Sequence, residues 1–154
     1  MTEREELLAR LTDKDAKAAC AYTEALTAEC RKSDRYFCYL DDFAALLRDK
    51  NSLVRNRAVA ILAANARWDA ENRYDALMDE LLAHVTDEKP ITARQCIKAL
   101  PEIAAAKPRL IPKIRTALES ADLTGYRDSM QPLILKDIVS ALRQLSGLED
   151  EIEK

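Results

Sequence analysis

Hydrophobic residues recur along this chain with the period of an α-helix rather than with the alternation of a strand. The clearest stripe lies in 71–85, where the apolar side chains are Tyr74, Leu77, Met78, Leu81, Leu82 and Val85. Their spacing of three and four residues places them on one face of a helix. No segment combines alternating apolar and polar residues with flanking turn signals, so we predict an all-α chain without strands.

Residues that favour helix starts divide the chain into eight predicted helices. Thr2 and Glu5 fit a capping box, 12–15 fits the same template, and Pro90 suits a first helical turn. Short connections require neighbouring helices to run antiparallel, and Pro101 is expected to kink the sixth helix. The predicted helices span roughly 3–11, 14–31, 34–48, 51–67, 70–85, 90–106, 109–121 and 129–146.

The second helices of successive pairs repeat one another in sequence. The segment 49–62 aligns with 87–100 at a shift of 38, a further shift of 42 places Leu100 on Leu142, and a backward shift of 36 aligns the first pair. Periods of this length are typical of two-helix repeats. One helix pair cannot bury its apolar face alone, so we expect a short α-solenoid of about four antiparallel helix pairs.

One repeat also carries a family-like motif. The pattern Asp49-x-x-x-x-Val54-Arg55-x-x-Ala58-x-x-x-Leu62 resembles the second-helix signature of the HEAT-repeat family. HEAT-like repeats occur in many scaffold and adaptor proteins. The resemblance therefore implies a non-enzymatic module that binds another protein, and it supplies no shared catalytic residues.

The repeats define the expected domain boundaries and core. Leu62, Leu81, Leu100 and Leu142 are predicted to be almost fully buried. The acidic tail at 148–154 is predicted to be frayed and solvated. We expect one domain over 1–147, with repeats at about 1–32, 33–68, 69–107 and 108–147.

Composition narrows the functional classes. The chain has 154 residues, 48% hydrophobic residues and two glycines, which favours a folded helical domain. Its net charge of −3 argues against a global attraction to nucleic acid or to an anionic membrane. The acidic N-terminus lacks a signal-peptide core, and no segment approaches the ~20 apolar residues of a membrane span. We therefore expect a cytoplasmic protein that does not contact membranes.

Four cysteines raise the question of a metal site. They are Cys20, Cys30, Cys38 and Cys96, and none of them forms a C-x-x-C motif. We predict reduced thiols that serve as small buried hydrophobic residues, with no metal and no cofactor. An iron–sulfur or other metal-handling role remains an alternative that rests on these cysteines alone.

No group of residues predicts catalysis. The single histidine, His84, lies near a helix end and is interpreted as structural. Trp68 is expected to plug a corner against the core. Tyr36 has core spacing, whereas Phe37 and Tyr39 are expected to be partly exposed. We therefore predict no catalytic residues.

The predicted binding residues come from the repeat alignment. It places Asn56, Arg94 and Lys136 at matching positions, and Lys98 lies one turn from Arg94. We expect these four residues to line a concave groove that binds another protein. The segment 88–118 carries seven basic and two acidic residues, a local charge of +5. Binding of nucleic acid through this basic face, as in HEAT-like DNA glycosylases, is the alternative.

Overall fold

A computed structural model describes residues 1–153, which form α-helices and short 3-10 segments with no strand among them. The predicted all-α class is therefore confirmed. The α-helices are α1 (Glu3–Leu11), α2 (Ala16–Cys30), α3 (Leu40–Ala45), α4 (Ser52–Asn65), α5 (Tyr74–Ala83), α6 (Pro90–Ala106), α7 (Ile111–Glu119) and α8 (Gln131–Glu153). The 3-10 segments are Phe37–Tyr39, Leu46–Arg48, Ala66–Trp68, His84–Thr86 and Pro108–Leu110.

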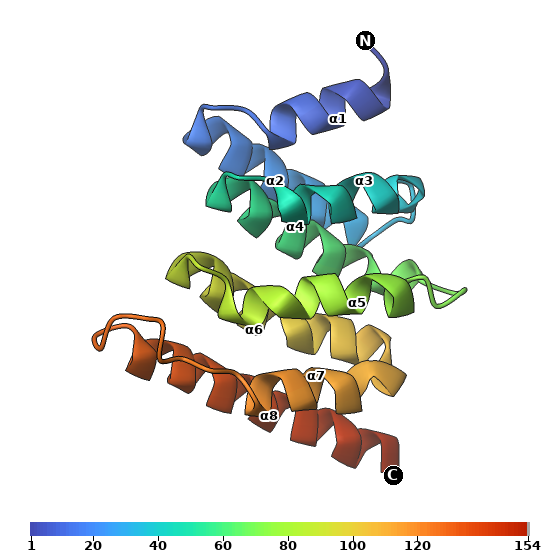
Figure 1. Ribbon diagram of the computed structural model, residues 1–154. Helices are drawn as coiled ribbons and strands as arrows, with labels where there is room; N and C mark the ends of the chain where they lie inside the picture. The colour runs from blue at the N-terminus through green and yellow to red at the C-terminus, as the bar shows by residue number, and fades with distance from the viewer. Residues whose placement is uncertain (154) are drawn as a thin grey trace.

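The helices lie in two layers. In the layer that we call the even layer, α2 packs on α4, α4 on α6 and α6 on α8. The odd layer contains α1, α3, α5 and α7, of which α1, α3 and α7 pack on the following even helix. Successive helix pairs lie beside one another, so α1 is at one end of the molecule and α8 at the other (Figure 1).

Local sequence explains where the helices begin. Thr2 and Asn51 cap α1 and α4 by accepting a hydrogen bond from a backbone N–H. The cap of α2 is Asp15, whose carboxylate accepts from the N–H of Ala18, and not Thr12. Pro101 lies inside α6, which continues through it as one α-helix. The predicted third helix at 34–48 is shorter, because 3-10 segments flank a six-residue α3.

Burial agrees with the prediction at three of the four predicted core positions. Leu62, Leu81 and Leu100 are fully buried, whereas Leu142 is only partly buried, so that prediction was wrong. Leu100 lies on α6, which packs against α8. Among residues 1–153 no helix pair follows α8 to cover Leu142 in the same way.

The C-terminal segment is also more ordered than the sequence suggested. α8 continues to Glu153, so 148–153 is helical rather than frayed. Leu148 packs on the core and Glu149 forms an ion pair with Arg115 of α7. These two contacts fix the last turns of the helix. Lys154, the last residue of the predicted tail, lies outside the described residues.

Candidate functional site

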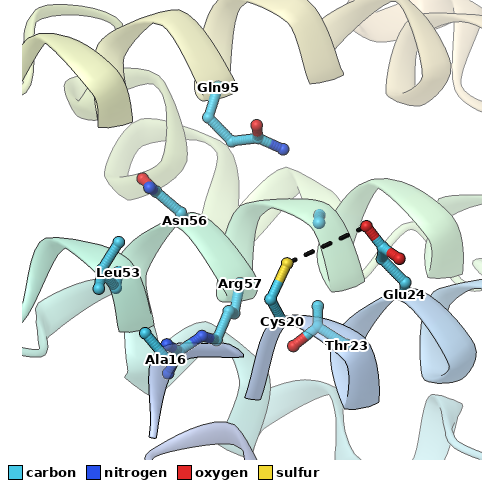
Figure 2. Close-up of a pocket in the computed structure, with 9 residues that line it drawn as sticks. Ala16, Cys20, Thr23, Glu24, Leu53, Asn56, Arg57 and Gln95 are labelled. Carbon is cyan, nitrogen blue, oxygen red and sulfur yellow. Dashed lines mark hydrogen bonds between the residues drawn. The ribbon is translucent and has the colours of Figure 1, made fainter. Parts of the chain in front are cut away.

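A shallow groove follows α4 on the surface of the even layer, between α2 and α6. At its first part is a hollow of about 300 Å³ that opens to solvent (Figure 2). Leu53, Asn56 and Ala60 of α4 form one wall, and Gln95 of α6 lies beside them. Cys20 of α2 lines the opposite wall.

A second hollow extends the first along α4. It shares Ala60 and Gln95 with the first hollow and adds Ala63, Lys98 and Glu102. Because Ala60 and Ala63 have small side chains, the surface of α4 is recessed between its two neighbouring helices. We call the two hollows together the α4 groove.

A third hollow lies on the same layer, between α6 and α8. It has a volume of about 520 Å³ and is lined by Pro101 and Ala105 of α6 and by Gln144 and Gly147 of α8. Lys98 lines both this hollow and the α4 groove. The even layer therefore presents one extended surface, unlike the enclosed apolar pockets that hold small ligands.

The four predicted binding residues do not all line one groove. Asn56 lines the α4 groove, and the exposed Lys98 lies where the groove meets the third hollow. Arg94 instead donates from Nε to Oδ2 of the buried Asp137 at 2.6 Å, which joins α6 to α8. Lys136 is exposed on α8 but lines none of these hollows.

Three exposed apolar residues lie on helices of the even layer. They were not predicted as site residues. Leu53, Ile91 and Leu133 are 39%, 59% and 41% exposed. They are related by the same shifts of 38 and 42 residues that align the repeats. Each begins an even helix, and Leu53 lines the α4 groove. Their equivalence was visible in the sequence, but the repeat spacing alone does not distinguish an exposed apolar residue from a buried one.

The basic segment 88–118 does not form one basic face. Lys107 is buried, and its Nζ donates to the carbonyl oxygen of Asp69 at 2.7 Å. Lys89 and Lys98 form no ion pair within residues 1–153. The other four basic residues pair with carboxylates on two helices, α5 and α8: Arg94 with Asp137, Arg109 with Asp75, Lys113 with Asp79 and Arg115 with Glu149.

Ion pairs also join successive helices of the odd layer. They connect Arg4 to Asp42, Arg73 to Asp41, Arg48 to Glu80, Arg109 to Asp75 and Lys113 to Asp79. Such exposed pairs contribute about 0–1 kcal/mol each, so they do not hold the fold together. They do neutralise many of the charges of this layer. The hydrogen bond from Arg4 also lowers the pKa of Asp42 below its usual range.

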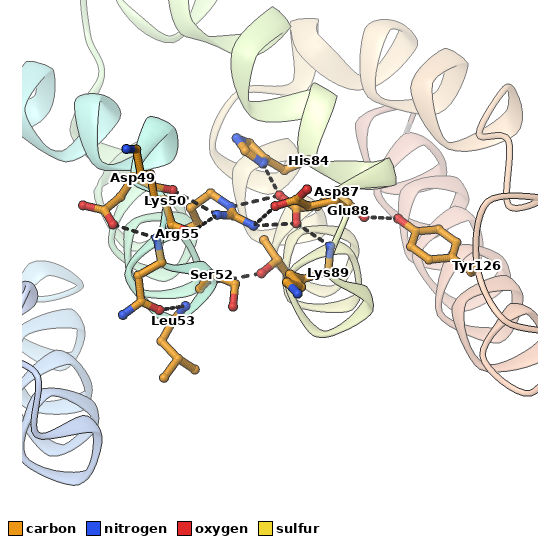
Figure 3. Close-up of polar contacts among 12 residues, drawn as sticks. Asp49, Lys50, Ser52, Leu53, Arg55, His84, Asp87, Glu88, Lys89 and Tyr126 are labelled. Atoms are coloured by element: carbon orange, nitrogen blue, oxygen red, sulfur yellow. Dashed lines mark hydrogen bonds and ion pairs between the residues drawn. The ribbon is translucent and has the colours of Figure 1, made fainter.

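One buried ion pair links two neighbouring helix pairs (Figure 3). Arg55 on α4 donates from Nε and Nη2 to the two carboxylate oxygens of Asp87, at 3.0 and 2.9 Å. Its Nη1 donates to the carbonyl oxygens of Asp49 and Lys50, which precede α4. The guanidinium therefore fixes the loop before α4 and the loop before α6 at the same time.

Asp87 is the centre of this network. Burial alone would raise its pKa, but hydrogen bonds from Arg55, from the backbone N–H of Lys89 and from His84 outweigh burial and lower the pKa below its ordinary value. Nδ1 of His84 lies 2.8 Å from the carboxylate, so this histidine has a structural contact, as predicted. The hydroxyl of Tyr126 donates to the backbone carbonyl of Asp87.

The aromatic residues divide between packing and surface. Trp68 is partly buried and donates from Nε1 to the carbonyl oxygen of Cys30, which agrees with its predicted role as a plug. Phe37 and Tyr39 are partly exposed, as predicted. Tyr36 packs against the core, as predicted, but it is only partly buried, because it precedes the helical segment rather than lying within it.

The cysteines are less uniform than predicted. Cys30 and Cys96 are buried, and burial raises the pKa of Cys96 to about 12. Cys20 and Cys38 are exposed, which corrects the prediction of four buried thiols. Cys20 faces the α4 groove, and Cys38 lies on the open side of a 3-10 segment. Within residues 1–153 no three histidine, cysteine or acidic side chains are placed to bind one metal ion.

Comparison with known proteins identified no relative. No protein-family model, no curated protein and no solved structure matched the chain. Among the described helices, none combines the length and the apolar character needed to cross a membrane.

Proposed function

We propose that this chain is a HEAT-like α-solenoid that binds another protein through the even layer and has no catalytic role. The observation that supports this proposal is the combination of a continuous α4 groove with the exposed apolar residues Leu53, Ile91 and Leu133. Exposed apolar residues that gather on one face are characteristic of protein-interaction sites. The odd layer also has a hollow, of about 320 Å³ between α5 and α7, but many of the charges of this layer are paired within the fold.

The preferred partner is a short amphipathic helix with acidic residues. The groove follows α4, whose 14 residues correspond to a length of about 21 Å. A helix laid in such a groove buries apolar residues at intervals of three and four positions. Leu53 and Ile91 supply the apolar contacts at one end, and the ammonium group of Lys98 suits a carboxylate farther along.

The two alternative functions have weaker physical support. Nucleic-acid binding requires cations that gather on one face. Here the basic residues of 88–118 are distributed over several helices and are largely paired. A metal-handling role requires several thiolates near one another, whereas Cys30 and Cys96 are buried and separate from the exposed Cys20 and Cys38.

A peptide selection tests the proposal and does not require that the partner be identified first. Random peptides displayed on phage are selected on immobilised wild-type protein, and their affinities are measured by fluorescence anisotropy. We expect selected sequences to combine apolar residues at helical spacing with acidic residues. The double substitution Ile91→Glu and Lys98→Glu should weaken their binding at least about tenfold, because burying one aliphatic side chain contributes about 1.5–3 kcal/mol.

The matched control is Lys113→Glu, which makes the same charge change as Lys98→Glu but on the odd layer. It should leave the affinity within about twofold of wild type. The proposal is wrong if the groove variant binds the selected peptides as tightly as wild type, or if both variants lose binding equally. Preferential binding of an oligonucleotide with a steep salt dependence would instead support the nucleic-acid alternative.

A further inference from the structure

The last helix exposes an apolar stripe at the end of the molecule. Leu135 and Val139 of α8 are 53% and 40% exposed, and Leu142 is partly exposed. Their spacing of four and three residues places them on one side of the helix. We call these three residues the end stripe. α8 is the final helix along the stack, with the other helices on one side of it (Figure 1).

The repeat register shows what covers this surface elsewhere. The shift of 42 residues relates the end stripe to Ala93, Ile97 and Leu100 of α6, and all three are fully buried. α6, which carries these residues, packs on both α7 and α8 of the following helix pair. The end stripe therefore has the composition of a buried surface, yet it is exposed in the described chain.

The opposite end of the stack is different. α1 buries Leu7 and Leu11 against the core and exposes Glu5, Glu6 and Arg10. The α1 end therefore presents charged side chains, whereas the α8 end presents leucine and valine. A hollow of about 380 Å³ beside Leu135, lined also by Leu123 and Pro132, enlarges the apolar surface.

The charges of α8 indicate which partner fits. Its first half carries the exposed cation Lys136, its middle the exposed Arg143, and its last turns the exposed acids Asp150, Glu151 and Glu153. Two copies of α8 that lie antiparallel across a two-fold axis near Leu142 bring each Lys136 opposite the acidic 149–153 of the other. A parallel arrangement would place like charges together.

We propose that two copies of this chain associate through α8, with the end stripe of one packed antiparallel on the end stripe of the other. Such an isologous contact is closed, so it forms a dimer rather than a filament. The end stripe lies on a different side of α8 from Gln144 and Gly147, which line the third hollow. The dimer therefore leaves the α4 groove open, and this proposal does not depend on the proposed function.

Sedimentation equilibrium of the full chain tests the contact. Wild-type protein should show a concentration-dependent equilibrium between monomer and dimer. Val139→Asp should raise the dimer Kd at least about tenfold, because it places a carboxylate in the centre of the apolar contact. Leu133→Asp is the matched control, since Leu133 is on the same helix and about equally exposed but lies outside the end stripe. It should leave the Kd within about twofold of wild type.

A charge exchange tests the antiparallel arrangement. Lys136→Glu and Asp150→Lys should each weaken self-association, and an equimolar mixture of the two variants should restore it, because both ionic contacts are then attractive. Circular dichroism verifies that every variant is folded, and Leu135→Ser replaces Val139→Asp if that variant unfolds. The proposal is overturned if wild type remains monomeric at about 1 mM, if the substitutions at 133 and 139 have equal effects, or if mixing restores nothing.

Discussion

Removing the Asp87 carboxylate should destabilise the fold more than removing any exposed carboxylate. The substitution Asp87→Ala leaves the Arg55 guanidinium buried without a counter-charge, since Arg55 is only 5% exposed. Breaking a buried ion pair by deleting one partner typically costs about 3–5 kcal/mol. The change also removes the acceptor for the N–H of Lys89 at the start of α6. For a chain of this length, that loss corresponds to a decrease in Tm of roughly 6–20 °C.

Urea unfolding followed by circular dichroism measures this effect directly. Asp79→Ala is the control, because Asp79 is largely exposed and pairs with the exposed Lys113. Its expected cost is about 0–1 kcal/mol. A cost below about 1 kcal/mol for Asp87→Ala, or equal costs for the two variants, would refute the conclusion that the buried pair joins successive helix pairs.

The same carboxylate predicts a dependence on pH. The pKa of Asp87 is lower in the folded chain than its ordinary value near 3.9, so its contribution to stability is fully present above that value. The contribution is lost as the pH falls through the lower, folded-state pKa. The difference in unfolding free energy between wild type and Asp87→Asn should therefore be constant near neutral pH and should shrink below about pH 4. A difference that grows on acidification would contradict this sign.

Three further results are expected. Leu100→Ala should cost about 2–5 kcal/mol in urea unfolding, whereas Leu142→Ala should cost less because its side chain is only partly buried. In the native protein the two exposed cysteines should react quickly with a thiol reagent, while Cys96 should react only on unfolding, since burial raises its pKa to about 12 and excludes the reagent. Glu102→Gln should weaken the loss of stability on acidification below about pH 4, because the hydrogen bond from Arg31 lowers the pKa of Glu102 in the folded state.

The sequence was sufficient to predict the helices because their signals are local. A stripe such as that in 71–85 specifies which face is buried, and caps such as Thr2 and Asn51 mark the helix starts. The predictions failed where burial and helix length depend on tertiary contacts rather than on local sequence. Leu142 has the spacing of a core residue, yet its burial depends on whether another helix pair follows. The last turns of α8 depend on contacts made by Leu148, which local composition does not reveal.

The candidate site was less predictable than the fold. The repeat alignment indicated Asn56 and Lys98, and both residues line the α4 groove. It could not show that Arg94 pairs with Asp137, because the two residues are 43 positions apart and their distance depends on how α6 and α8 pack. For the same reason, the local charge of +5 in 88–118 suggested a basic face that the folded chain does not form.

Site-specific photo-crosslinking in cells tests the central claim most directly. A photoreactive amino acid at position 60, within the α4 groove, should form a covalent adduct with a partner protein. The Ile91→Glu and Lys98→Glu substitutions should abolish this adduct, and the same photoreactive residue at position 113 of the odd layer should form none. The account is contradicted if the adduct forms equally from position 113, or if it persists unchanged in the groove variant.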